Sequence, residues 1–81
     1  MSHDPETIRQ AARAAIASVA KQPVRDDQCV VSTGIVDSLS LLNLIVLLEK
    51  SLRIHIPPEK VQPEDFDSVD IILETLERVA T

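Results

Sequence analysis

Aromatic side chains are almost absent from this sequence, in which Phe66 is the only one and neither tryptophan nor tyrosine occurs. The core of the 81 residues must therefore come from leucine, isoleucine, valine and alanine, a composition that suits packed helices. The chain also lacks the aromatic platforms on which single-stranded nucleic acids usually stack. At this length one hydrophobic core is barely sufficient, so we expect a single all-α domain over residues 1–81.

Positive charge is scarce too, because eight lysines and arginines stand against thirteen acidic residues and leave a net charge of −5. The excess lies in residues 54–81, where seven acids face only Lys60 and Arg78. An acidic domain repels nucleic-acid phosphates and anionic lipids, and it favours protein partners with basic patches. We therefore expect no binding to membranes and none to nucleic acid, including by a helix-turn-helix.

The chain has a single cysteine, and it has no histidine cluster and no long apolar run. The one cysteine, Cys29, cannot form an internal disulfide, and no Cys-x-x-Cys pair or histidine cluster indicates a metal site. Cys29 precedes two valines, and we interpret it as a small hydrophobe. The longest apolar run, residues 44–48, is too short to cross a bilayer, and Asp4 and Glu6 lie where a signal sequence needs other residues. We expect a cytoplasmic monomer.

Hydrophobic periodicity and capping residues predict four helices. Apolar residues recur at the 3.6-residue spacing of amphipathic helices, and Asp4 followed by Pro5 is a typical helix start. Pro23 should end the first helix, because the residue before a proline is biased away from helical geometry. Asp67 or Ser68 should cap the last. We expect a small antiparallel four-helix bundle with three main helices and one short one. In chain order they cover about residues 5–21, 38–52, 63–66 and 68–80.

The connections on either side of the second helix differ in character. Residues 23–36 form a long connection for a compact helical domain, so we expect it to have a function. Its glycine, Gly34, suits a sharp turn with positive φ just before the second helix. After that helix, Ile54 and Ile56 should anchor the chain to the core with His55 facing solvent between them. The Pro-Pro pair that follows should block the continuation of any regular element.

The start of the second helix suits an attached anion. Asp37 is a good N-cap, because its carboxylate can accept N–H bonds that a new helix leaves without partners. Ser38 would then be the first helical residue, with its hydroxyl exposed where the helix dipole favours negative charge. A serine that carries a phosphodiester would fit this position.

The rest of this helix has two apolar faces. One face should pack on the core and consists of Leu41, Leu44, Ile45, Leu48 and Leu52. The other carries Ser38, Leu39, Leu42, Val46, Glu49 and Arg53. An exposed leucine gains nothing until a partner covers it, so we interpret part of the second face as a surface for partner enzymes. We call this surface, made of Leu39, Leu42, Val46 and Glu49, the docking face. The alternative is a helix buried on two sides.

Asp37-Ser38-Leu39, followed by a leucine-rich helix, resembles the attachment motif of the acyl carrier protein family. Three further segments match at family-like distances, and they cover residues 49–57, 63–66 and 67–71. The resemblance extends over nearly the whole chain. It implies an acyl-carrier-like fold in which Ser38 bears a 4′-phosphopantetheine arm that a phosphopantetheinyl transferase adds from coenzyme A.

The resemblance also implies a function. Acyl or aminoacyl intermediates would be held as thioesters on the arm, loaded by one enzyme and passed to downstream synthases or transferases. Asp37 and Leu39 complete the attachment site, and in the family the matching aspartate contacts the transferase's metal. We expect no enzymatic activity, because no histidine lies near Ser38 in the sequence to act as its base.

Two departures from the family narrow the interpretation. Ser40, Asn43 and Lys50 stand in a helix that is acidic in carriers for bulk fatty acid synthesis, and His55 replaces another common acid. Electrostatic steering should therefore be weak and docking more hydrophobic. This favours a specialised pathway, such as polyketide or aminoacyl biosynthesis, with the cargo left open. The alternative is an unmodified helical interaction module that uses Leu39, Leu42 and Val46.

Overall fold

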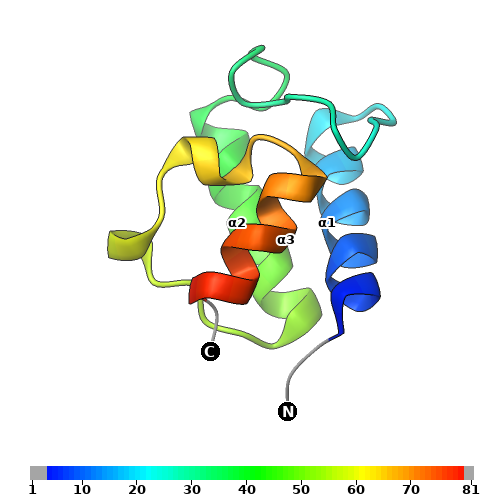
Figure 1. Ribbon diagram of the computed structural model, residues 1–81. Helices are drawn as coiled ribbons and strands as arrows, with labels where there is room; N and C mark the ends of the chain where they lie inside the picture. The colour runs from blue at the N-terminus through cyan, green and yellow to red at the C-terminus, as the bar shows by residue number, and fades with distance from the viewer. Residues whose placement is uncertain (1–3, 80–81) are drawn as a thin grey trace.

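The computed structural model describes residues 4–79, and within them every regular element is helical (Figure 1). The α-helices of this range are α1 (Pro5–Ala20), α2 (Ser38–Leu52) and α3 (Val69–Val79). Two single-turn 3-10 helices, η1 (Pro58–Lys60) and η2 (Pro63–Phe66), lie between α2 and α3. The all-α expectation is confirmed, and the molecule is a small helical bundle.

Helix α1 begins at the predicted residue and ends one residue earlier than predicted. The Asp4 carboxylate accepts the Thr7 N–H at 2.7 Å, and Pro5 is the first helical residue. The helix stops because Lys21 adopts the left-handed conformation, with φ 59°, and its N–H returns to the Ala17 carbonyl. The helix thus ends one residue before the predicted residue 21, and Pro23 follows two residues after the cap, where it cannot continue the helix.

The segment between α2 and α3 holds one element that the sequence did not predict. Residues 63–66 form the expected short helix, η2. Pro58 begins η1, which the sequence did not predict, since the Pro-Pro pair was expected only to block the continuation of a preceding element. A proline is tolerated there because the first N–H groups of a helix have no internal partner. Helix α3 starts at Val69, one residue later than predicted, and its predicted last residue, 80, lies outside the described residues.

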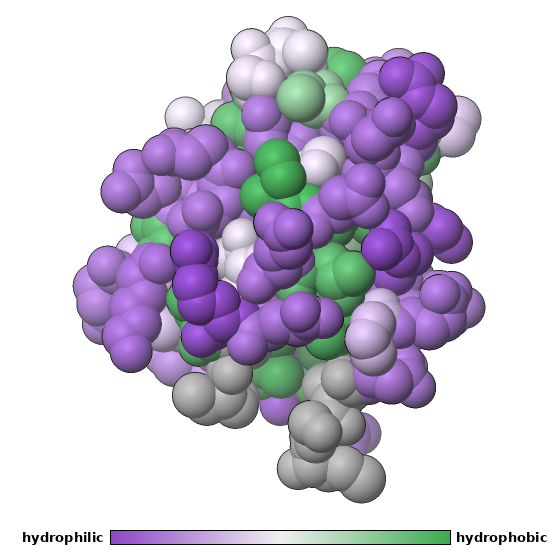
Figure 2. Space-filling view, in the orientation of Figure 1, coloured by the Kyte–Doolittle hydropathy of each residue, from purple (hydrophilic) through white to green (hydrophobic). Residues whose placement is uncertain are grey.

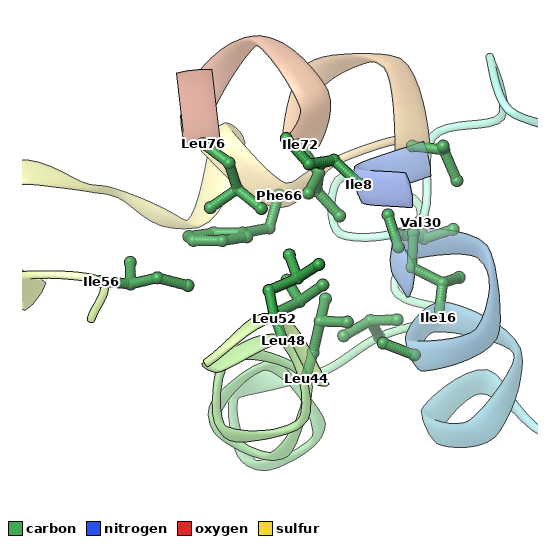
Figure 3. Close-up of a cluster of buried hydrophobic side chains, with 14 residues drawn as sticks. Ile8, Ile16, Val30, Leu44, Leu48, Leu52, Ile56, Phe66, Ile72 and Leu76 are labelled. Carbon is green, nitrogen blue, oxygen red and sulfur yellow. The ribbon is translucent and has the colours of Figure 1, made fainter. Parts of the chain in front are cut away.

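Helix α1 runs opposite to α2 and α3 and packs against both (Figure 1). Side chains from these helices and from both connections meet in one core, where the ring of Phe66 lies between Leu76 and Leu52 (Figure 3). Burial of each large aliphatic side chain contributes about 1.5–3 kcal/mol. The buried apolar residues are Ile8, Ala12, Ala15, Ile16, Val30, Val36, Leu44, Leu48, Leu52, Ile56, Phe66, Val69, Ile72 and Leu76.

Cys29, interpreted from the sequence as a small hydrophobe, does not belong to this core. Its side chain is exposed, whereas its neighbour Val30 is fully buried. The chain turns at this point, and only one of two successive side chains can point inward. Cys29 is thus an accessible thiol beside a fixed core residue.

A charge cluster ties α1 to the first connection and to α3. The Arg9 guanidinium contacts Asp26 at 2.8 Å and Asp70 at 2.7 Å, and Arg13 binds both oxygens of Asp26. The bonds from Arg13, and then those from Arg9, lower the pKa of Asp26 to about 2 against the opposing effect of burial. The cluster holds the start of the connection against the bundle.

The face of the molecule that Figure 2 presents is mainly hydrophilic, with apolar groups visible between the polar side chains. Helix α3 lies in front in this orientation (Figure 1), and it carries exposed Asp70, Glu74 and Glu77. Among residues 4–79, no helix has the length and apolarity that crossing a membrane requires.

Candidate functional site

Ser38 is the first residue of α2, and it is exposed. Asp37 precedes it as N-cap, with its Oδ1 accepting the Ser40 N–H at 2.9 Å and its carbonyl accepting the Leu41 N–H at 2.8 Å. The bond from the Ser40 backbone is the main cause that lowers the pKa of Asp37. The predicted cap is confirmed, and an ionised carboxylate fixes the turn that presents the Ser38 hydroxyl.

The surroundings of Ser38 offer no obvious catalytic partner. His55 is the only histidine among the described residues, and it follows the opposite end of α2 with a side chain 71% exposed. No group of three or more histidine, cysteine or acidic residues in this range could hold a metal ion. Ser38 thus has an exposed hydroxyl with no histidine beside it among the described residues.

Three apolar side chains of the docking face point into solvent on the same helix. Leu39 is 76% exposed, Leu42 61% and Val46 45%, whereas large apolar side chains elsewhere in residues 4–79 are at least partly covered. Burial of α2 on two sides, the alternative drawn from the sequence, is wrong for these residues. Their exposure leaves an apolar strip that begins next to Ser38.

Glu49 differs from the other members of the docking face. Its side chain is 29% exposed, and its Oε2 accepts the Ile56 N–H at 2.9 Å. The same oxygen lies 3.5 Å from Nδ1 of His55. The carboxylate thus fastens the chain that follows α2, and a role in docking stays a prediction.

A hollow of about 400 Å³ lies between α2 and the segment that returns through η1 and η2. Its walls are almost entirely apolar: Leu41, Leu42, Ile45 and Val46 on the α2 side, and Ile56, Val61 and Phe66 on the other. The sequence did not reveal it, because Leu41 and Ile45 were expected in the core and are only half-buried. No local pattern in the sequence could predict the hollow, since it depends on where the second connection lies relative to α2.

The connection before α2 is held by Asp67, which the sequence marked only as a possible cap for the last helix. Ser68 performs that capping, with its Oγ accepting the Ile71 N–H at 3.1 Å. Asp67 instead accepts the N–H groups of Val30, Val31 and Ser32. Burial acts to raise the pKa of Asp67, but the bonds from these residues outweigh it and the pKa is lowered.

No protein-family model matches the chain, and no curated protein matches it. What the site can do follows from its geometry. An exposed serine hydroxyl lies at a capped helix start, an apolar strip begins beside it, and an apolar hollow adjoins that strip. Such an arrangement can accept a covalent group, shelter an apolar one and bind another protein.

Proposed function

We propose that the protein is a carrier domain of the acyl carrier type, with a 4′-phosphopantetheine arm on Ser38. The observation that carries the proposal is the exposed Ser38 on the first turn of α2, directly before the apolar strip of Leu39, Leu42 and Val46. The order of elements supports it as well. The order α1, α2, η1, η2 and α3 is compatible with the acyl-carrier-like bundle that we propose from the sequence motifs.

The residues around Ser38 fit such an arm. The hydroxyl is exposed, and the N–H groups and dipole at the start of α2 favour a phosphodiester. The Asp37 carboxylate binds the Ser40 N–H, so its charge is directed at the helix end. During attachment Ser38 Oγ would form the bond to phosphorus while the pyrophosphate bond of coenzyme A breaks. 3′-Phosphoadenosine 5′-phosphate would leave, and the hydroxyl proton would pass to the transferase. Once bound, the arm supplies the thiol on which cargo is carried as a thioester.

The hollow beside α2 supports an apolar acyl cargo. It begins at Leu41 and Leu42, one helical turn after Ser38, and its walls offer carbon to a chain that would otherwise lie in water. Each methylene group that leaves water gains about 0.8 kcal/mol. An acyl chain suits these walls better than the charged amino group of an aminoacyl cargo.

The polar side chains of α2 support a specialised pathway. Ser40 and Asn43 occupy positions where carriers for bulk fatty acid synthesis are expected to be acidic, and the one acid, Glu49, is bound to Ile56. Partners would therefore dock mainly by apolar contact. The partners in this proposal are a phosphopantetheinyl transferase, a loading enzyme and a downstream synthase or transferase, which the carrier would meet as a cytoplasmic monomer.

One other function is favoured by a specific observation. The exposed Leu39, Leu42 and Val46 would equally suit an interaction module that binds a protein and is never modified. Such a module would have no need of Ser38. The two functions therefore separate on the fate of the serine.

The test is intact mass spectrometry after incubation with coenzyme A and a broad-specificity phosphopantetheinyl transferase. We expect a gain of one phosphopantetheinyl group in the wild type and none in Ser38→Ala. Ser51→Ala is the matched control, because Ser51 is also an exposed serine of α2 but lies near its other end; it should be modified normally. A folded wild type that takes no arm would contradict the carrier and favour the interaction module.

A further inference from the structure

We propose that Asp67 is a positioning residue, which holds the connection before α2 so that Ser38 is presented to the transferase in one orientation. The inference rests on the proposed function. It assigns a role to a residue that lies 29 positions after the serine in the chain and makes none of the bonds that cap α2.

One carboxylate oxygen of Asp67 gathers three consecutive backbone donors. Oδ1 accepts the N–H of Val30 at 3.0 Å, of Val31 at 2.7 Å and of Ser32 at 3.0 Å. The Asp67 carbonyl also accepts the Val30 N–H, at 2.7 Å. Successive N–H groups that converge in this way form a concave site for an anion. Here the anion belongs to the chain itself, and it closes the connection against the start of α3.

A short path leads from these bonds to Ser38. The Val30 carbonyl accepts the Val36 N–H at 2.8 Å, and both valines are buried in the core. Gly34, with φ +83°, makes the turn between them. Asp37 follows Val36 directly and caps α2, so the direction in which the chain enters Ser38 is set by the closed loop of residues 30–36.

The contacts separate this role from a general one in stability. Helix α3 has its own cap in Ser68, so the Asp67 carboxylate is not needed to start it. The core contacts of Val30 and Val36 are made by their own side chains. Removal of the carboxylate should therefore release the N–H groups of Val31 and Ser32, leave Val30 bound only to the Asp67 carbonyl, and loosen residues 30–36 while the bundle remains folded.

Transfer kinetics test the proposal, with the protein as the varied substrate and the same transferase. If only part of the population has a competent loop, the apparent affinity falls by that fraction while the docked reaction is unchanged. We expect Asp67→Ala to raise KM about tenfold or more with little change in kcat. Asp67→Asn should keep KM close to the wild-type value, because its Oδ1 can accept the same bonds. A loss of stability alone would not produce this split in a variant that circular dichroism shows to be folded.

Asp70→Ala is the matched control. Asp70 is an exposed residue on the first turn of α3 whose carboxylate contacts Arg9. Its backbone N–H donates to the Asp26 carbonyl, a bond that alanine keeps. Its loss should leave KM unchanged. If Asp67→Ala does not fold, Asp67→Glu tests the positioning role instead. It keeps the charge but displaces the oxygen, so it should also raise KM.

The exposed thiol of Cys29 offers an independent readout next to Val30. A nitroxide attached to this cysteine should show a sharper, more mobile spectrum in Asp67→Ala than in the wild type or Asp70→Ala. Equal KM values and equal spectra for the wild type and a folded Asp67→Ala would overturn the positioning role and leave the carrier function intact. A wild type that takes no arm would instead contradict the carrier function, and the positioning role would fall with it.

Discussion

The two faces of α2 use the same kind of side chain for different ends. Leu44, Leu48 and Leu52 are at most 2% exposed, whereas Leu39 and Leu42 on the other face are more than half exposed. Burial of a leucine is worth about 1.5–3 kcal/mol, and an exposed one adds little to folding. The buried face therefore accounts for the bundle, and we propose that the exposed face serves to bind a partner.

The largest expected difference between the two faces is in stability, when one leucine on each face is shortened to alanine. Leu48→Ala should lower the free energy of unfolding by about 2–5 kcal/mol, because it removes buried methyl groups and leaves a cavity. Leu42→Ala should change it by no more than about 0.5 kcal/mol, since surface substitutions rarely do more and alanine favours the helix. Urea denaturation followed by circular dichroism measures both. A similar loss in the two variants would mean that the exposed face is part of the core.

A charge placed on the exposed face should separate docking from folding. Val46→Asp sets a carboxylate in the middle of the apolar strip, and we expect kcat/KM for arm transfer to fall about tenfold, equivalent to about 1.4 kcal/mol of lost contact. Stability should stay within about 0.5 kcal/mol, because Val46 is 45% exposed and valine and aspartate have similar helix propensities.

Ser51→Asp is the control for Val46→Asp, because it adds the same charge at an exposed position of α2 outside the docking face. It should transfer the arm at the wild-type rate. Unfolding of Val46→Asp would show that this face supports the bundle, and an unchanged kcat/KM would remove Val46 from the docking surface.

Features that depend on neighbouring residues could be predicted from the sequence. Asp4 and Asp37 each bind the N–H three residues ahead, as expected of N-caps. Periodicity identified the buried leucines of α2, and the one glycine has the positive φ expected of it. The position of Ser38 needed only this local chemistry, because a cap and an apolar period define where a helix starts.

Features that depend on distant residues could not be predicted. The bonds from Val30, Val31 and Ser32 to Asp67 join residues 35 to 37 positions apart, and either Asp67 or Ser68 was a reasonable cap on local grounds. The exposure of Cys29 depends on a turn whose direction its neighbours do not fix. The hollow is lined by Leu41 and Ile45 of α2 together with Val61 and Phe66, so it depends on how segments distant in the sequence meet.

Substitution of Glu49 should have the smallest effect of these changes, and it tests to which of the two faces this residue belongs. The sequence placed it on the docking face, but its Oε2 accepts the Ile56 N–H and its side chain is only 29% exposed. Glu49→Ala leaves that N–H without a partner and should lower the free energy of unfolding by about 1 kcal/mol. Glu49→Gln retains an acceptor and should keep most of the wild-type free energy of unfolding. A stability loss with normal arm transfer would assign Glu49 to the structural side of α2. Normal stability with slower transfer would return it to the docking face and show that the bond to Ile56 contributes little.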